Sequence, residues 1–424
     1  MLKIYKASQI TAEEIVSARD LSYADVESGV KELICDVRAN GDAAVRKYTL
    51  KFDKADVTDF KVSDGEISLA LERTGAEFIR ILERAAKNIE RFHAAQLRKD
   101  FKLDYDGITV GQRFLPVESA GIYVPGGTAR YPSSVLMNAV PARLAGVKNI
   151  IMCTPPSPDG GIPDNILAAA KVAGVNAVYK IGGAQAIAAM AYGTESIPKV
   201  DKIAGPGNVY VATAKKLVQG AAGIDMIAGP SEILVIADKY ANPEWVAADL
   251  LSQAEHDKLA SAILLTDDPA FAEKCLEAVE RRVKKLPRRD IAEASLEANG
   301  KIIVTENLVD AARLADEIAP EHLELAVRDS EELLNKIRNA GSVFLGYYTP
   351  EATGDYMAGA NHTLPTGGTA RFSSPLGVDD FIKKSQFIRF TPESLDSYAG
   401  DIAAFARAEG LTAHAESVEV RVNE

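Results

Sequence analysis

Short apolar runs alternate with helical stretches from about residue 107 to residue 346, and this alternation constrains the fold more than any other feature. The runs are GIYV (121–124), NIIMC (149–153), AVYKI (177–181), DKIAG (201–205), EILVIAD (232–238), SAILLTD (261–267), KIIVT (301–305) and SVFLG (342–346). Strand–helix alternation of this kind predicts parallel sheets covered by helices on both faces. The runs are too many for one small sheet, so we expect an α/β fold with two such domains.

The first hundred residues predict helices instead. Thr11 and Glu14 stand at the spacing of a capping box. A helical apolar pattern follows, and Gly41 can end it. A second long amphipathic pattern covers residues 66–98. It contains His93, which we interpret as a packing or surface residue.

Charge and cysteine content exclude several classes of protein. Sixty acidic residues against 48 basic ones give a net charge of −12, so we expect no nucleic-acid partner. Cys35, Cys153 and Cys275 are too scattered for a disulfide framework or a thiolate metal site, which favours a reducing, cytoplasmic setting. The most apolar stretch, 135–153, contains a proline and charged residues, and the N-terminus lacks the features of a secretory signal. We therefore expect no membrane partner.

Glycine and proline turns lie next to four of the predicted strands. They are Pro125-Gly126-Gly127, Gly182-Gly183, Gly205-Pro206-Gly207 and Gly229-Pro230. Ligands of open α/β sheets bind outside the carboxyl ends of the strands, where helix N-termini favour anions. Ordinary tight turns are the alternative for any one of them, but four together favour a ligand crevice. The G-x-G-x-x-G dinucleotide fingerprint is absent, so a nucleotide site here is a variant one.

Two motifs in the C-terminal half carry candidate chemistry. Gln253 and His256 stand three residues apart at the end of a predicted helix and so project from one face. Amide oxygen and imidazole can bind zinc or another divalent metal; a solvated helix end is the alternative. Glu321 and His322 are an adjacent carboxylate and imidazole suited to proton transfer near neutral pH. Their alternative is a helix-capping glutamate beside an incidental histidine.

Two further motifs lie in turn-like or terminal segments. Asp355 and His362 belong to a turn-rich stretch, where ordinary turn chemistry is the alternative to a site role. Glu409 and His414 lie close to the C-terminus; such a tail can reach a neighbouring subunit, or it is simply exposed. Together the four motifs offer nitrogen and oxygen donors without cysteine, which suits a catalytic zinc ion better than a closed structural site. The H-E-x-x-H motif is absent.

Seven stretches resemble the histidinol dehydrogenase family and occur in that family's order. They are GIYVPGG (121–127), GGAQAIAAMAYGTESIPKVDKIAGPGN (182–208), DMIAGPSEILVIAD (225–238), LLSQAEHD (250–257), APEHLEL (319–325), GDYMAGANHTLPT (354–366) and EGLTAH (409–414). The resemblance implies oxidation of L-histidinol through L-histidinal to L-histidine with two NAD, the last step of histidine biosynthesis. It also implies one zinc per active site and a homodimer.

The resemblance further implies an aldehyde-dehydrogenase-like fold with two Rossmann-like parallel-sheet domains. On this basis we expect a helical N-terminal arm (1–24), a first α/β domain (25–122 with 233–374), a second α/β domain (123–232) and a C-terminal extension that reaches the partner subunit (375–424). The implied zinc ligands are Gln253, His256, Asp355 and, from the partner subunit, His414.

The remaining implied site residues fall into three groups. Glu321 and His322 are the implied acid–base pair. Ser231, His362 and Glu409 are implied to contact the substrate, together with His322 and the four zinc ligands. Tyr123, Gln185 and Asn208 are implied to contact NAD.

Three other functions remain open from the residues alone. Cys153, at the end of a predicted strand, is the candidate nucleophile of an aldehyde-dehydrogenase-like route, although its neighbours supply no charge that would activate it. A zinc-dependent hydrolase could use Glu321 as the base for a metal-bound water. A non-catalytic metal- or imidazole-binding protein is the third possibility, and the presence of both Glu321 and His322 speaks against it.

Overall fold

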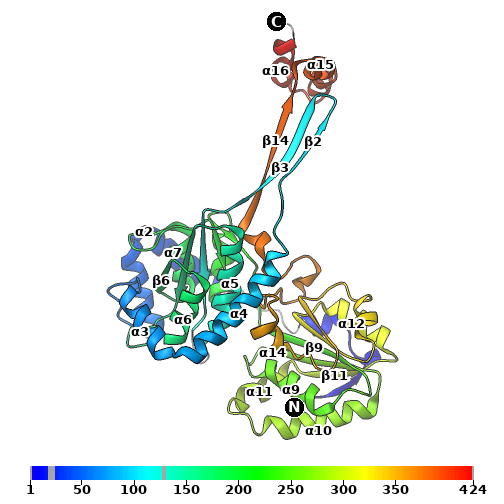
Figure 1. The fold of residues 1–424 in the computed structure, drawn as a ribbon. Coiled ribbons are helices and arrows are strands. Elements are labelled where there is room, and N and C mark those ends of the chain that lie inside the picture. The colour runs from blue at the N-terminus through cyan, green and yellow to red at the C-terminus, as the bar shows by residue number, and fades with distance from the viewer. Residues whose placement is uncertain (1, 18–23, 127–129, 423–424) are drawn as a thin grey trace. The chain divides into compact units, whose positions relative to one another are not determined.

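A computed structural model describes residues 2–17, 24–126 and 130–422 (Figure 1). Its contacts divide the chain into two compact units, the first with residues 1–96 and 118–381 and the second with residues 97–117 and 382–424. The first unit carries two parallel sheets, so the predicted α/β class with two such layers is confirmed.

A five-stranded parallel sheet has the order β6-β5-β4-β7-β8. Its strands are β4 (Ser119–Tyr123), β5 (Asn149–Thr154), β6 (Ala177–Lys180), β7 (Lys202–Ala204) and β8 (Gly223–Ile224). The connecting helices are α5 (Pro132–Ala145), α6 (Asp164–Ala173), α7 (Gly183–Tyr192) and α8 (Val209–Val218). The strand order reverses between β4 and β7, which is where doubly wound sheets form a ligand crevice.

The N-terminal helices pack around this sheet. They are α2 (Ala24–Asp53), which is kinked at Gly41, α3 (Asp64–Thr74) and α4 (Ala76–Ala94). Apolar residues of α2 share a core with α7, α8 and the strands, while α3 and α4 contact α5 and α6. Our expected grouping of residues 25–122 with 233–374 therefore differs from the packing, because the apolar faces of these helices are buried against the other sheet. Gly75, at φ 79°, separates α3 from α4 within the pattern that predicted one long helix.

A six-stranded parallel sheet has the order β1-β11-β10-β9-β12-β13. Its strands are β1 (Ile4–Lys6), β9 (Glu232–Ala237), β10 (Ser261–Thr266), β11 (Lys301–Val304), β12 (His322–Ala326) and β13 (Ser342–Leu345). One face packs against α9 (Pro243–Ala254), α10 (Pro269–Val283) and α11 (Arg289–Ala298). The other packs against α1 (Ala12–Ser17), α12 (Leu308–Ile318) and α13 (Ser330–Leu334). Its strand order reverses between β9 and β12.

Residues 2–17 belong to this second sheet layer. β1 pairs in parallel with β11, so part of the expected N-terminal arm is a sheet strand. The predicted capping box at the start of α1 is present: the Glu14 N–H donates to Thr11 Oγ1 at 3.2 Å, and the Thr11 N–H donates to Glu14 Oε2 at 2.8 Å.

The second unit combines an antiparallel sheet with two helices. The sheet contains β14 (Ile382–Phe390), β3 (Ile108–Pro116) and β2 (Phe101–Tyr105), in that order. The helices α15 (Pro392–Ala408) and α16 (Thr412–Val422) pack on each other, and their buried core is a cluster of three alanines. No helix in the described residues is both long and apolar enough to span a membrane.

Candidate active site

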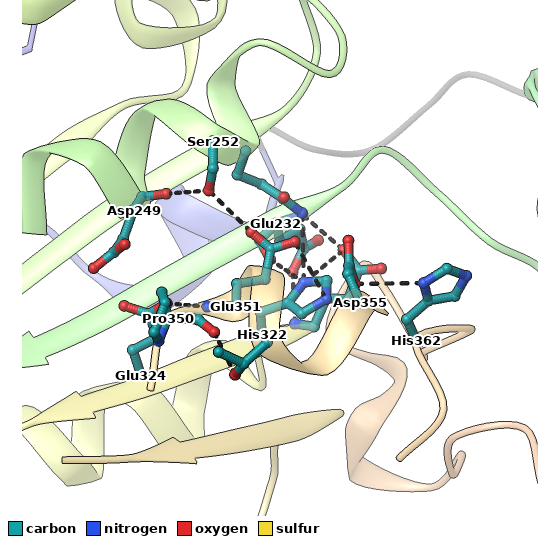
Figure 2. Close-up of polar contacts among 12 residues, drawn as sticks. Glu232, Asp249, Ser252, His322, Glu324, Pro350, Glu351, Asp355 and His362 are labelled. Atoms are coloured by element: carbon teal, nitrogen blue, oxygen red, sulfur yellow. Dashed lines mark hydrogen bonds and ion pairs between the residues drawn. The ribbon is translucent and has the colours of Figure 1, made fainter. Parts of the chain in front are cut away.

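Polar side chains converge at the amino ends of β9 and β12, the two central strands of the six-stranded sheet (Figure 2). Glu232 begins β9, and Glu321 and His322 stand at the start of β12. All three residues are buried. We expected ligands at the carboxyl ends of strands, so this cluster lies at the opposite end of its sheet from that rule.

His322 has two ring nitrogens in different environments. Nδ1 lies 3.0 Å from the main-chain oxygen of Glu232 and donates to it. Nε2 is buried and has no hydrogen-bond partner in the described part of the chain. The bond at Nδ1 fixes the tautomer, so Nε2 is the nitrogen that is left to accept a proton or bind a metal.

Glu232 and Glu321 are joined by reciprocal bonds. The Glu232 N–H donates to Glu321 Oε2 at 2.8 Å, and the Glu321 N–H lies 3.4 Å from Glu232 Oε2. Glu232 Oε1 accepts from the Gly367 N–H at 2.8 Å. These bonds hold β9, β12 and the loop that contains Gly367 together. They thereby fix the positions of Glu321 and of His322, the implied acid–base pair.

Gln253, at the end of α9, is oriented by Glu351 of the short helix α14 (Glu351–Thr353). With the Gln253 amide turned so that its oxygen and nitrogen both meet suitable partners, its nitrogen donates to both carboxylate oxygens of Glu351, at 3.1 and 3.0 Å, and its oxygen accepts from the Glu232 N–H at 3.2 Å. Ser252 Oγ donates to Glu351 Oε2 at 3.0 Å, and the Glu351 N–H donates to Glu324 Oε1 at 2.7 Å. The Glu351 carboxylate is thus fixed from two sides (Figure 2).

Asp355 lies in the π-helical turn η2 (Gly354–Ala358) that follows α14. Its Oδ1 is 3.5 Å from His362 Nδ1, and His362 Nε2 is 3.2 Å from Ser134 Oγ of α5. His256 follows α9 in a turn and is close enough to Asp355 and Glu321 for their charges to act on its pKa. Burial outweighs those charges and lowers the pKa of His256.

A set of three groups could hold a metal ion. Ligand atoms of His322, Glu351 and Asp355 all lie within 4.8 Å of one another. The Nε2 of His322, which has no hydrogen-bond partner among the described residues, forms a nitrogen–oxygen donor set with the buried Glu351 and the half-buried Asp355, and zinc accepts such donors. Of the four ligands implied by the resemblance, Asp355 belongs to this set. Gln253 is hydrogen-bonded to Glu351, which is a member of this set. The charge of Asp355 acts to raise the pKa of His256.

Crowded carboxylates dominate the electrostatics of the cluster. Burial acts to lower the pKa of His322, but the charges of Glu321, Glu351 and Asp355 prevail and raise it to about 10. Burial raises the pKa of Glu351 to about 7 despite the nearby imidazole. Burial also opposes ionisation of Asp355, but the contact with His362 lowers its pKa. With a pKa of about 10, the His322 imidazole is protonated on both nitrogens at neutral pH. A cation bound among the carboxylates would offset their charge and lower that pKa, which would free Nε2 to act as a base.

The three residues implied to contact NAD line one cavity of about 910 Å³ in the first unit. Tyr123 ends β4, Gln185 lies in the first turn of α7, and Asn208 is the N-cap of α8. The cavity opens at the carboxyl ends of β4 and β5 and beside α2. Its volume suits a large ligand such as a dinucleotide.

Helix N-termini at this cavity already have partners. The Gly183 N–H donates to the Tyr123 hydroxyl at 3.0 Å. The N–H groups of Tyr210 and Val211 donate to Asn208 Oδ1 at 3.1 and 3.2 Å. The expected use of these helix starts to hold phosphate is therefore weakened, because three of their donors are occupied within the protein.

The other implied residues have separate positions. Ser231 is half-buried and immediately precedes β9. Glu409 and His414 belong to the second unit, at the end of α15 and in α16, and both are exposed. Cys153 is buried, and burial raises the pKa of its thiol, so the structure opposes its use as a nucleophile.

Glu351 is a site residue that the sequence interpretation missed. It stands four residues before Asp355, and that spacing brings two side chains to one face of a helical turn. The spacing was a usable signal, but the glycine- and proline-rich context predicted a loop.

Comparisons with known proteins identify the family. The histidinol dehydrogenase family model matches residues 16–422. Curated histidinol dehydrogenases of Bacillus cereus and Geobacter metallireducens are 52% and 53% identical over 400 and 402 residues, covering 94% of this chain and 93% and 92% of theirs. The crystal structure of histidinol dehydrogenase from Elizabethkingia anophelis has a TM-score of 0.94 and 43% identity, covering 100% of this chain and 98% of that one.

These matches define an α/β oxidoreductase of the dehydrogenase class. The chain belongs to the histidinol dehydrogenase family. The resemblance found in its seven sequence motifs is thereby confirmed.

Proposed function

We propose that the protein oxidises L-histidinol through L-histidinal to L-histidine, with zinc and two NAD per turnover, as the last step of histidine biosynthesis in the cytoplasm. The observation that carries the proposal is the arrangement of His322. Its Nδ1 is fixed by the main-chain oxygen of Glu232, while its buried Nε2 has no hydrogen-bond partner among the described residues and lies 3.8 Å from Glu351 Oε1. Family membership supplies the substrate, since the curated relatives are named for histidinol.

Nitrogen and oxygen donors of this kind fit a single zinc ion. Of the three groups whose ligand atoms lie together, we assign only Asp355 as a zinc ligand, with Gln253, His256 and the partner subunit's His414 as the others. His322 then serves as the base, and Glu351 holds the Gln253 amide in place. When bound, the metal orients the imidazole and amino nitrogens of the substrate, and NAD accepts hydride. Tyr123, Gln185 and Asn208 contact the dinucleotide in the cavity that they line.

The residues of the chain then carry the protons. His322 Nε2 accepts the proton of the substrate hydroxyl as the carbinol carbon loses hydride. Glu321 takes a proton from water, which adds to the aldehyde carbon and gives the hydrate. His322 accepts a hydroxyl proton again in the second oxidation. Ser231, His362 and Glu409 contact the substrate and hold the aldehyde between the two steps, so that it is not lost to solvent.

A homodimer accounts for the surface of the second unit. Its sheet and helices expose Phe101, Leu103, Tyr105, Ile388, Phe405 and Val420, each at 49% or more of the side chain's reference area. The buried apolar cluster between its two helices consists of three alanines, which contribute little apolar burial to stabilise the unit, and a partner copy would cover the exposed apolar side chains. His414 lies in this unit, in agreement with its donation to the partner's site.

The deciding experiment is the ratio of NADH formed to L-histidinol consumed, before and after metal is removed by a chelator. Two NADH per substrate, lost on chelation and restored by zinc, is the expected result. One NADH with release of free aldehyde would reduce the reaction to alcohol oxidation and contradict the role of Glu321. No NADH would favour a zinc hydrolase or a non-catalytic binding protein.

A further inference from the structure

Asp53 is a carboxylate at the cavity that the proposed function gives to NAD. It is the last residue of α2, and it lines the cavity with Gln185 and Tyr123. Its Oδ2 lies 3.4 Å from Gln185 Nε2. A side chain at Gly182 would come within 3.2 Å of Asp53 Oδ1, so the carboxylate stands beside the N-terminus of α7.

The Asp53 and Gln185 side chains leave acceptors unused. Burial raises the pKa of Asp53 to about 6. Gln185 is fully buried, and its Oε1 has no hydrogen-bond partner among the described residues. A buried acceptor without a donor costs free energy unless a ligand supplies the donor. Asp53 is only half-buried and is the member of the pair that a ligand can reach, so its free lone pairs fit a ligand group with hydroxyls.

Phosphate is the wrong ligand for this position. An anion beside a half-buried carboxylate is repelled, and Asp53 already occupies the space near the N-terminus of α7 where a phosphate would otherwise bind. Lys51 and Arg130 are the cations among the described lining residues. They match the two negative charges of a diphosphate and leave no cation for a third phosphate.

The neighbour of Asp53 offers a surface for a base. Phe52 lines the same cavity and is 54% exposed. Its ring stacks on Tyr48, with centroids 5.9 Å apart and planes at 9°, and Lys51 Nζ lies over it, 5.1 Å from the centroid. Nucleobases stack on exposed aromatic rings of this kind. A base on Phe52 would bring its own ribose close to the next residue along the chain.

We propose that Asp53 binds the hydroxyls of the adenosine ribose and thereby excludes dinucleotides that carry a 2′-phosphate. The proposal rests on the proposed use of NAD and goes beyond it, because it names the residue that selects NAD over its phosphorylated form. Ribose hydroxyls donate to the free carboxylate lone pairs, whereas a 2′-phosphate would place further negative charge against the same oxygens.

The test is equilibrium binding of ADP-ribose and 2′-phospho-ADP-ribose to the full chain by calorimetry, which needs no catalysis. The unmodified protein should bind ADP-ribose more tightly. Asp53→Asn should weaken ADP-ribose binding, because one ribose acceptor is lost, and should improve the relative affinity for the phosphorylated form roughly tenfold to a hundredfold. The ratio of kcat/KM for NAD and NADP should change in the same direction.

Asp56→Asn is the matched control, since Asp56 is exposed, lies three residues away and is outside the cavity lining. It removes the same charge and should leave both affinities unchanged. If Asp53→Asn leaves the ratio of the two affinities unchanged, whether or not both affinities fall, Asp53 lies away from the 2′ position and the inference is overturned. Failure of the unmodified protein to bind ADP-ribose or NAD would instead overturn the proposed function.

Discussion

His322 donates from Nδ1 to the main-chain oxygen of Glu232, 3.0 Å away across the pair β12–β9. The same nitrogen lies 3.4 Å from Glu321 Oε2, so the main-chain oxygen and the carboxylate both favour the tautomer with its proton on Nδ1. The reactive nitrogen is consequently Nε2, which the strand pairing holds in a buried position. This relationship explains why a histidine occupies the first position of a buried central strand.

Replacement of the two implied acid–base residues should separate their roles. His322→Asn should lower the rate of both half-reactions by about 10²–10⁴-fold, since the same base serves both oxidations. Glu321→Gln should impair oxidation of the aldehyde more than oxidation of the alcohol, because it removes the group that activates water. Stopped-flow measurement of each half-reaction checks this, and equal losses in the two half-reactions of Glu321→Gln would contradict the division.

Loss of the Glu351 carboxylate should weaken the metal site. The Gln253 amide nitrogen donates to both carboxylate oxygens of Glu351. Glu351→Gln replaces one of these two acceptors by an amide nitrogen, which cannot accept. Residues that orient metal ligands typically contribute 10–100-fold to affinity, so zinc affinity should fall by about that factor. Competition with a chromogenic chelator measures it. Glu332→Gln, on the exposed helix α13, is the control and should leave the affinity unchanged.

The sequence predicted the strands of both parallel sheets better than it predicted the site. All eight apolar runs are strands, because a buried parallel strand must be almost continuously apolar. β12 (His322–Ala326) was missed because His322 and Glu324 interrupt its apolar pattern. β2, β3 and β14 were also missed. Phe101, Leu103 and Tyr105 of β2 do alternate with polar residues, so a strand pattern was available in the sequence, although all three side chains are exposed.

Site residues could be predicted where they stand together in a sequence motif. They could not be predicted where only the folded structure brings them together. Glu321 and His322 are adjacent in sequence and stand out as a pair. Glu232 looks like an ordinary strand residue, and its role depends on the pairing of β9 with β12, which no local pattern reveals. The same holds for Asp53, whose contact with Gln185 joins residues 132 positions apart.

Cysteine chemistry should be dispensable. Cys153 and Cys275 are buried, and burial raises the pKa of both thiols, that of Cys275 to about 12. Iodoacetamide should therefore label the folded protein at the exposed Cys35 without loss of activity. Cys153→Ser should retain turnover. Inactivation that tracks with labelling of Cys153 by mass spectrometry would revive the covalent route.

Asp53 should also make stability depend on pH. Its folded pKa of about 6 lies above the ordinary value of 3.8, so the folded state resists ionisation. Protonated Asp53 contributes to the free energy of unfolding below about pH 4, and this contribution is lost as the pH rises through about 6. Asp53→Asn removes that loss and should stabilise the protein above pH 6, by about 1–2 kcal/mol after allowance for solvent screening. Thermal unfolding at pH 4 and pH 8 checks this: the gain should appear only at pH 8, and Asp56→Asn should show none.

Donation of His414 across the dimer can be tested by mixing two inactive variants. A His414→Asn chain retains its own His322, and a His322→Asn chain retains its His414. In a mixed dimer, one site then combines the intact His322 of the first chain with the intact His414 of the second. If His414 serves its own chain instead, every site in the mixture lacks one of the two residues.

Co-refolding equal amounts of the two variants should thus restore about a quarter of the unmodified activity, because half of the dimers are mixed and each has one complete site. Each variant refolded alone is the control and should stay inactive. Phe405→Glu, which places a charge on an exposed apolar side chain of α15, should reduce the dimer fraction in light scattering. A mixture that remains inactive while light scattering shows dimers would assign His414 to its own chain.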